Sequence, residues 1–178
     1  MESWSDSVIQ ELFIIDPPTK DIISMNENIS VADICWAAGI IDGEGCITIH
    51  KRNPKAEKKA TRSPYYRLDI KVKMVHKPAV ERLKSIFGIG TILCEKPGKN
   101  SKRVAWKWLV YGKDCIEVLK HTIPHLTVKQ KDATIALEFL PINIKTAFGH
   151  QRISPEVLAR RDEMYKKMQA VKQYEWTE

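Results

Sequence analysis

Ala37-Ala38-Gly39-Ile40-Ile41-Asp42-Gly43-Glu44-Gly45 is the stretch that says most about the fold of this chain. It follows Ser30-x-x-Asp33, which has the form of a capping box and predicts that a helix begins at Ser30. Two glycines bracket Glu44, and because glycine favours helix ends, we expect the helix to stop there. Small residues at successive turns give this helix one face on which another backbone can come very close.

This small-residue face predicts contact with a second helix. A glycine inside a helix costs about 1 kcal/mol relative to alanine, so close packing should offset the cost of Gly39. The chain contains only one such Gly-rich, acid-ending string, so the same helix in a second copy of the chain is the natural partner. The expected residues of this dimer interface are Ala38, Gly39 and Asp42.

The acids at the end of this helix predict a bound cation. A helix C-terminus carries a partial negative charge, which disfavours Asp42 and Glu44 at this position. Pairing two such helices would crowd the carboxylates of both copies beside two negative helix ends. A divalent cation would make this arrangement tolerable and, next to phosphate, would form a metal site.

Alternation of apolar and polar residues predicts four strands, at residues 46–52, 67–74, 89–95 and 103–111. Further helices are expected at 79–87, 113–122, 127–140 and from Ser154 onwards. The order predicts an α+β fold: an αββαββα core with a four-stranded antiparallel sheet and helices on its apolar face. Residues 1–29, with a short helix expected at 8–15, are interpreted as an N-terminal extension, and residues 30–178 as one domain.

The other face of this sheet is predicted to bind DNA. Residues 46–110 hold 17 Lys or Arg against 4 acids, a local charge of +13 in a chain whose net charge is +7. A broad face of basic and hydrogen-bonding side chains fits a major groove. The expected DNA-binding residues are Thr48, His50, Arg52, Arg67, Asp69, Lys71, Lys73, Arg103 and Lys107.

Other features indicate neighbouring roles or exclude other classes of protein. The segment from Lys51 to Arg67 holds seven basic residues and one acid, and should follow the DNA backbone. No stretch is long and apolar enough for a membrane span, and no P-loop, GxSxG or Cys/His cluster occurs.

Trp106 and Trp108 fall on the core face of their strand. The cysteines form no CxxC pair and are predicted to be small buried hydrophobes: Cys35, Cys46, Cys94 and Cys115.

Position for position, residues 37–45 resemble the LAGLIDADG motif, with Ala for the first Leu, Ile for the second, Gly for the second Ala and Glu for the last Asp. The strand and helix order over roughly residues 30–175 is also similar to that family. The chain therefore resembles the single-motif LAGLIDADG homing endonucleases. This resemblance implies a sheet shaped as a DNA-binding saddle, a homodimer, a palindromic or pseudo-palindromic target and Mg²⁺, with Mn²⁺ or Ca²⁺ also able to occupy the site.

The resemblance also implies roles for individual residues. In the family the acid before the last Gly binds the catalytic metal, which assigns that role to Glu44, with the carbonyl of Gly43 as the second protein ligand. Asp42 would help to hold the helix end. Lys129 falls on the position of the family's active-site lysine, with Lys131 as the near alternative.

One position departs from the family pattern. The family's polar, water-organising residue after the second strand maps near Lys73 or Met74, and a methionine cannot do that work. Either Lys73 or His76 substitutes for it, or the register differs. In the family, metal would activate a water for in-line attack on the phosphate and stabilise the leaving oxygen. The resemblance also implies products with cohesive 3′ overhangs.

The favoured function is a site-specific, metal-dependent double-strand DNA homing endonuclease. One active site cuts one strand, so two chains would act on a two-fold symmetric target. The alternative is a non-cleaving nucleic-acid binder of the same fold, either an intron maturase or a transcription regulator, and a purely structural dimerisation domain is the third hypothesis. The sequence assigns no location beyond an intracellular one; an organelle, a phage and a viral element stay open.

Overall fold

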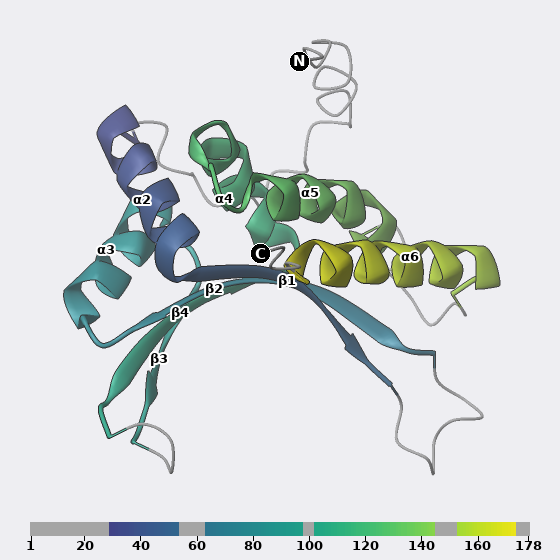
Figure 1. The fold of residues 1–178 in the computed structure, drawn as a ribbon, viewed down its shortest axis with the longest axis horizontal. Coiled ribbons are helices and arrows are strands. Elements are labelled where there is room, and N and C mark those ends of the chain that lie inside the picture. The colour runs from purple at the N-terminus through teal and green to yellow at the C-terminus, as the bar shows by residue number, and fades with distance from the viewer. Residues whose placement is uncertain (1–28, 54–62, 98–101, 145–152, 174–178) are drawn as a thin grey trace, which may run out of the picture.

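The computed structural model describes residues 29–53, 63–97, 102–144 and 153–173. Within these ranges, five helices lie over one face of a four-stranded antiparallel sheet (Figure 1), which confirms the predicted α+β fold. The expected short helix at 8–15 and most of the basic segment between Lys51 and Arg67 lie outside the described residues. The elements in chain order are α2 (Val31–Glu44), β1 (Gly45–Arg52), β2 (Tyr65–Met74), α3 (Lys77–Phe87), β3 (Thr91–Glu95), β4 (Ala105–Tyr111), η2 (Gly112–Asp114), α4 (Cys115–Thr122), η3 (Ile123–His125), α5 (Gln130–Ile144) and α6 (Pro155–Lys172).

Helix α2 begins and ends where the sequence predicted. The Ser30 hydroxyl accepts a hydrogen bond from the backbone N–H of Asp33 at 3.1 Å and caps the helix. At the other end β1 follows without a loop, because Gly45 lies against the last turn of the helix. A Cβ on Gly45 would lie 2.4 Å from the carbonyl oxygen of Ile41, so only glycine fits there. The end of α2 is therefore fixed directly to the first residue of the edge strand β1.

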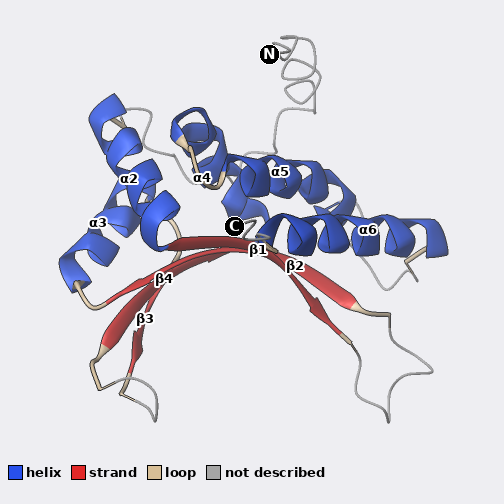
Figure 2. Cartoon of the chain, viewed as in Figure 1, coloured by secondary structure: helices blue, strands red, loops and turns tan. Residues whose placement is uncertain are grey.

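The strands are ordered β1-β2-β4-β3, and each neighbouring pair is antiparallel. Figure 2 shows an arched sheet with the described helices on its convex side. The concave side carries the opposite set of alternating side chains. The described part of the chain thus has the predicted saddle shape, with an open concave face beneath a layer of helices.

Two predicted strands are shorter than expected. Arg103 lies in the turn before β4, which begins at Ala105. Strand β3 begins at Thr91 because Gly90 has a positive φ of 88° and interrupts the extended backbone. A Cβ on Gly90 would also lie 2.5 Å from the indole nitrogen of Trp108, so a larger residue would clash with Trp108.

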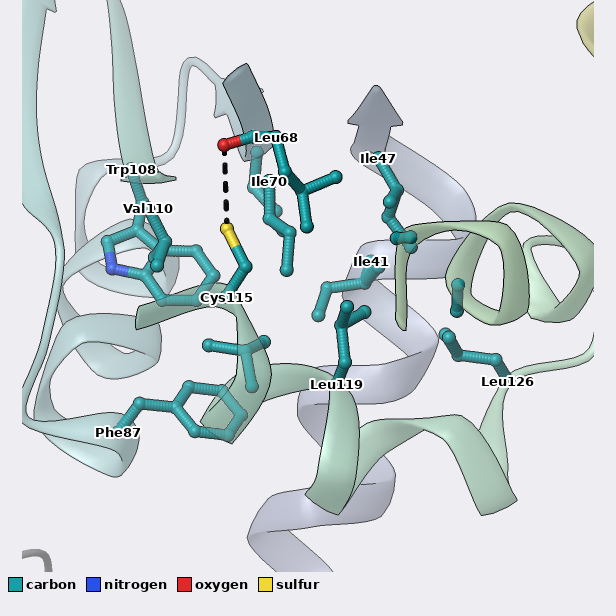
Figure 3. Close-up of a cluster of buried hydrophobic side chains, with 14 of the residues drawn as sticks. Ile41, Ile47, Leu68, Ile70, Phe87, Trp108, Val110, Cys115, Leu119 and Leu126 are labelled. Carbon is teal, nitrogen blue, oxygen red and sulfur yellow. Dashed lines mark hydrogen bonds between the residues drawn. The ribbon is translucent and has the colours of Figure 1, made fainter. Parts of the chain in front are cut away.

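The hydrophobic core lies between the convex face of the sheet and the helices. Ile41 of α2, Ile47 of β1 and Leu119 of α4 point toward one another in Figure 3, and each is at most 1% exposed. Trp108 is fully buried, stacks on Phe87 and donates its indole N–H to the carbonyl of Ile89 at 3.0 Å. Trp106 is only partly buried against the same core.

Of the four cysteines predicted to be buried, Cys115 is buried, Cys46 is partly buried, and the other two are exposed. Cys115 is fully buried, and its thiol lies 3.8 Å from the carbonyl oxygen of Leu68 (Figure 3). Cys35 and Cys94 are exposed, because they lie on the outward face of α2 and on the edge strand β3. None of the helices in the described ranges combines the length and the apolar character needed to cross a membrane.

Candidate active site and nucleic-acid interface

The acidic end of α2 is held by the start of α5. The carboxylate of Asp42 accepts the backbone N–H groups of Thr127 at 2.7 Å, Val128 at 3.2 Å and Lys129 at 2.9 Å. These three donors come just before α5, which explains why this helix begins at Gln130 and not at the expected residue 127. Asp42 therefore acts as a capping group for a helix that lies more than 80 residues further along the chain.

This contact also stabilises the charge of Asp42. Burial alone would raise the pKa of this carboxyl, but the N–H groups of Thr127, Lys129 and Val128 bring the pKa below its ordinary value of 3.8. The charge that should be unfavourable at the end of α2 is thus compensated within the chain. Glu44 is the exposed acid at this end of the helix.

We expect Asp42→Asn to lower the free energy of unfolding by about 1–2 kcal/mol, because an amide replaces the anion that accepts these N–H groups. The folded-state pKa of Asp42 is depressed, so its contribution is complete at neutral pH and is lost as the pH falls below 3.8. Urea unfolding at pH 7 and near pH 3 measures both effects. Asp114→Asn is the matched control, since Asp114 precedes α4 without a capping hydrogen bond from its side chain. An equal loss in both variants would contradict the capping role.

Lys129 lies at the same helix end. Its ammonium group donates to the carbonyl oxygen of Asp42, and it is partly buried. Lys131, the alternative from the sequence, is exposed on the first turn of α5. The structure therefore brings Lys129 into contact with Asp42, one of the two motif acids.

A hollow of about 240 Å³ opens beside Lys129. Two of its charged residues were given no role by the sequence. Asp132 is 5% exposed, and burial raises its pKa above the ordinary value of 3.8, although the positive charges of Lys172 and Lys129 partly oppose this effect. Lys172 comes from the last turn of α6, and its ammonium group lies 3.4 Å from the thiol of Cys46. Asp132 could have been noticed from its place next to the lysine segment, whereas nothing local to Lys172 marks it. The hollow is lined by Gly45, Cys46, Ile47, Val128, Lys129, Asp132 and Lys172.

Of the three residues expected at the dimer interface, only Gly39 lies on the outward face of α2, because Asp42 binds the start of α5 and Ala38 is buried. Ala38 is 0% exposed and packs in the core of its own chain, so its side chain is not available to a partner. Gly39 and Gly43 are exposed, and a Cβ added to either would meet nothing within 4 Å. Val31, 68% exposed, and Cys35 lie at the same four-residue spacing, so the outward stripe is Val31, Cys35, Gly39 and Gly43.

The concave face holds most of the residues predicted to bind DNA. His50, Arg52, Lys71, Lys73 and Lys107 belong to β1, β2 and β4, on the side away from the core. Thr48 and Asp69 lie on this face as well, but they are only 7% and 3% exposed. They are cross-strand partners on β1 and β2, where neighbouring side chains cover them. Both are therefore poorly placed for direct contact with a base.

Three charged side chains form a second cluster on the concave face. Glu95 of β3 contacts the ammonium groups of Lys73 and Lys107, each at 2.5 Å. These hydrogen bonds, that of Lys107 first, lower the pKa of Glu95 to about 2. The position that the resemblance assigns to a water-organising residue is thus occupied by a lysine bound to an acid.

The two other candidates for that position lie elsewhere. Met74, the last residue of β2, is partly buried against the core and pairs across the sheet with Trp106. His76 is exposed and precedes the first turn of α3. Among the residues that the structure describes, no three His, Cys, Asp or Glu side chains come together as a metal-binding cluster.

A family model matches this chain in sequence, and several solved structures share its fold. The family model described as LAGLIDADG endonuclease matches residues 37–134. The homing endonuclease I-CvuI, in complex with its target in the presence of Ca, has a TM-score of 0.64 at 18% identity, over 83% of this chain and 87% of that chain. The archaeal intron-encoded homing endonuclease I-Vdi141I, complexed with DNA, has a TM-score of 0.64 at 12% identity, over 83% of this chain and 89% of that chain.

A third solved structure is the group I intron-encoded homing endonuclease I-CeuI complexed with DNA. It has a TM-score of 0.60 at 15% identity, over 80% of this chain and 69% of that chain. No curated protein sequence matches the chain. At these identities the solved structures establish the fold, and the family model carries the relationship in sequence.

Proposed function

The chain belongs to the LAGLIDADG endonuclease family, and on this premise we propose that it is a homing endonuclease that binds and cuts double-stranded DNA as a homodimer. The observation that carries the proposal is the end of α2, where Lys129 donates to the carbonyl of Asp42, and the exposed residues Gly43 and Glu44 follow directly in the chain. The catalytic domain spans residues 30–178, and residues 1–29 are an extension to it.

Divalent metal fits the residues at this helix end. Mg²⁺ prefers hard oxygen ligands, and the carboxylate of Glu44 and the carbonyl of Gly43 are both of this kind. Carbonyl groups in the last turn of a helix have no partner further along it, so the Gly43 oxygen is chemically suited to a ligand. When bound, the metal supplies Lewis-acid activation of water and stabilises negative charge on phosphate oxygens. Mn²⁺ and Ca²⁺ meet the same donor set, and a relative, I-CvuI, was crystallised with its target in the presence of Ca.

This chain's own groups supply the remaining functions. Asp42 fixes Lys129 beside the motif through its three backbone contacts, so the Lys129 ammonium group is positioned before substrate binds. A cation there favours a phosphate group and the negative charge that develops during hydrolysis. Lys172, which lines the same hollow as Lys129, adds positive charge for the same phosphate.

The homodimer rests on the outward stripe of α2. Glycine at Gly39 and Gly43 leaves the helix backbone open to another backbone, and exposed Val31 adds apolar area. Val128, 59% exposed and bonded through its N–H to Asp42, extends the apolar surface next to this stripe. Two copies joined here would place two catalytic ends side by side and two concave faces in line along one duplex.

A cleavage screen tests the proposal. The full chain is incubated with a randomised duplex library in Mg²⁺ and in EDTA, and cut ends are sequenced. We expect cuts on both strands at a two-fold symmetric site, with cohesive 3′ ends, in Mg²⁺ alone. Sequence-specific binding with intact DNA in Mg²⁺, Mn²⁺ and Ca²⁺ would overturn the nuclease assignment.

One observation favours a second function, that of a non-cleaving nucleic-acid binder of the same fold. Met74 packs against the core, and Lys73 is bound to Glu95, so neither offers a polar group for a catalytic water in the present arrangement. An intron maturase or a transcription regulator would need no such group. RNA-stimulated splicing, or binding to a DNA site that stays intact, would establish this function.

A further inference from the structure

Both oxygens of a buried carboxylate on the concave face are in contact with neighbouring side chains of the same chain. Asp69 has a side chain that is 4% exposed. Its Oδ1 accepts from Nε of Arg67 at 2.6 Å, and its Oδ2 accepts from Nη2 of the same residue at 2.8 Å. Nε2 of His50 lies 3.1 Å from Oδ2. Both carboxylate oxygens therefore already accept hydrogen bonds within the chain.

This arrangement leaves Asp69 without a role as a direct reader of bases. An aspartate reads DNA by accepting from an exposed amino group such as N4 of cytosine, which needs an accessible oxygen. Its two donors, by contrast, reach outward: the side chains of Arg67 and His50 are 36% and 50% exposed. The buried acid thus lies beneath two exposed donors.

Arg67 is fixed from two sides. The two parallel hydrogen bonds to Asp69 use Nε and one hydrogen of Nη2. The guanidinium carbon also lies 5.1 Å from the ring centre of Tyr111, the cross-strand partner of Asp69 on β4. A guanidinium group has five N–H donors, so the Nη1 pair and one Nη2 hydrogen stay available on the edge away from Asp69. That edge presents two parallel donors.

His50 lies directly opposite Arg67 in the sheet. Burial lowers the pKa of His50, and Asp69 only partly opposes this effect, so the ring is neutral at pH 7. With Nε2–H donated to Asp69, Nδ1 is an acceptor. Arg67 and His50 thus offer two donors and one acceptor on neighbouring side chains, since the Cβ atoms of a cross-strand pair lie about 5 Å apart.

We propose that Asp69 is a positioning residue that orients Arg67 and His50 to select a G·C base pair at one position of each half-site. Guanine presents N7 and O6 as adjacent acceptors in the major groove, which match the free edge of a guanidinium group. The Nδ1 atom of His50 suits the amino group of cytosine or of a neighbouring adenine. This inference rests on the proposed DNA-binding function of the concave face.

Equilibrium selection from a randomised duplex library tests the inference, with every variant made in a Glu44→Gln background so that DNA stays intact. We expect the parent to prefer guanine at this position by about 5- to 150-fold, the range for a bidentate arginine contact. Asp69→Asn should remove this preference and leave preferences elsewhere and the salt dependence of binding unchanged. Arg67→Lys should have the same effect, since lysine cannot form the two-donor edge.

The double variant separates positioning from general damage. If Asp69 acts through Arg67, Asp69→Asn combined with Arg67→Lys should lose no more discrimination than either single variant. Glu95→Gln is the matched control, because Glu95 is also an acid on the concave face but contacts Lys73 and Lys107. It should leave the guanine preference intact.

Three results would overturn the inference. They are an unchanged base preference in Asp69→Asn, an equal loss of preference at every position with an unchanged melting temperature, and a guanine preference that survives Arg67→Lys. Should Asp69→Asn fail to fold, Arg67→Lys decides the question, because Arg67 is a surface side chain. A parent protein with no base preference at all would instead contradict the proposed site-specific function.

Discussion

Glu44→Gln is expected to lower the rate of strand cleavage by at least about 100-fold and to leave target binding intact. Glu44 is the exposed acid at the end of α2, and it supplies the charged oxygen of the proposed metal site. The amide keeps the size of the side chain but removes its charge, so the metal loses a strong ligand. Several kcal/mol of transition-state stabilisation depend on that metal, which sets the scale of the loss.

Binding should be as tight as before, or tighter. A carboxylate beside a phosphate group repels it, and the substitution removes that repulsion without touching the concave face. Single-turnover cleavage and equilibrium binding on the same duplex measure the two effects. Glu163→Gln is the matched control, since Glu163 is an exposed acid of α6 paired with Lys167. Cleavage in Mg²⁺ at the parent rate by Glu44→Gln would end the catalytic assignment.

Gly39→Leu is expected to convert the proposed dimer to a monomer and to abolish the proposed double-strand cleavage. A Cβ at this position meets nothing within 4 Å in the protomer, so the protomer has room for the larger side chain. Leucine is also a better helix former than glycine by roughly 1 kcal/mol. Any loss of assembly must therefore come from the partner copy, whose backbone would meet the new side chain.

Sedimentation velocity measures the assembly, and circular dichroism measures the fold. The melting temperature of the parent should rise with protein concentration, because dimerisation stabilises by mass action, whereas that of Gly39→Leu should not change. Ala170→Leu, a small-to-large change at an exposed position of α6, is the control and should stay dimeric. A Gly39→Leu protein that sediments as a dimer would show that the outward stripe of α2 is not the interface.

The order and type of the helices and strands follow from local patterns in the sequence. The capping box at Ser30, the glycine at position 45 and the period-two alternation of β2 are local patterns, set by backbone geometry and by the need to bury one face. They predicted α2 from its first residue to its last and the antiparallel sheet, and the resemblance of residues 37–45 to the LAGLIDADG motif predicted the family. They also put Glu44 and Lys129 on the list of site residues, through the motif and the segment before α5.

The partners of these side chains, in contrast, depend on how distant segments of the chain pack together. Asp42 caps α5 because the chain brings residues 127–129 back to the end of α2. Ala38 is buried because the α2 surface that packs on the core includes it, whereas Gly39 faces outward. Periodicity predicts on which face of a helix or strand a residue lies. It does not predict whether other side chains bury that residue, because burial depends on strand register and on distant elements. For the same reason the sequence predicted Asp69 as a DNA contact. In the structure, strand register brings His50 and Tyr111 next to Asp69, and together with Arg67 of the same strand they bury it.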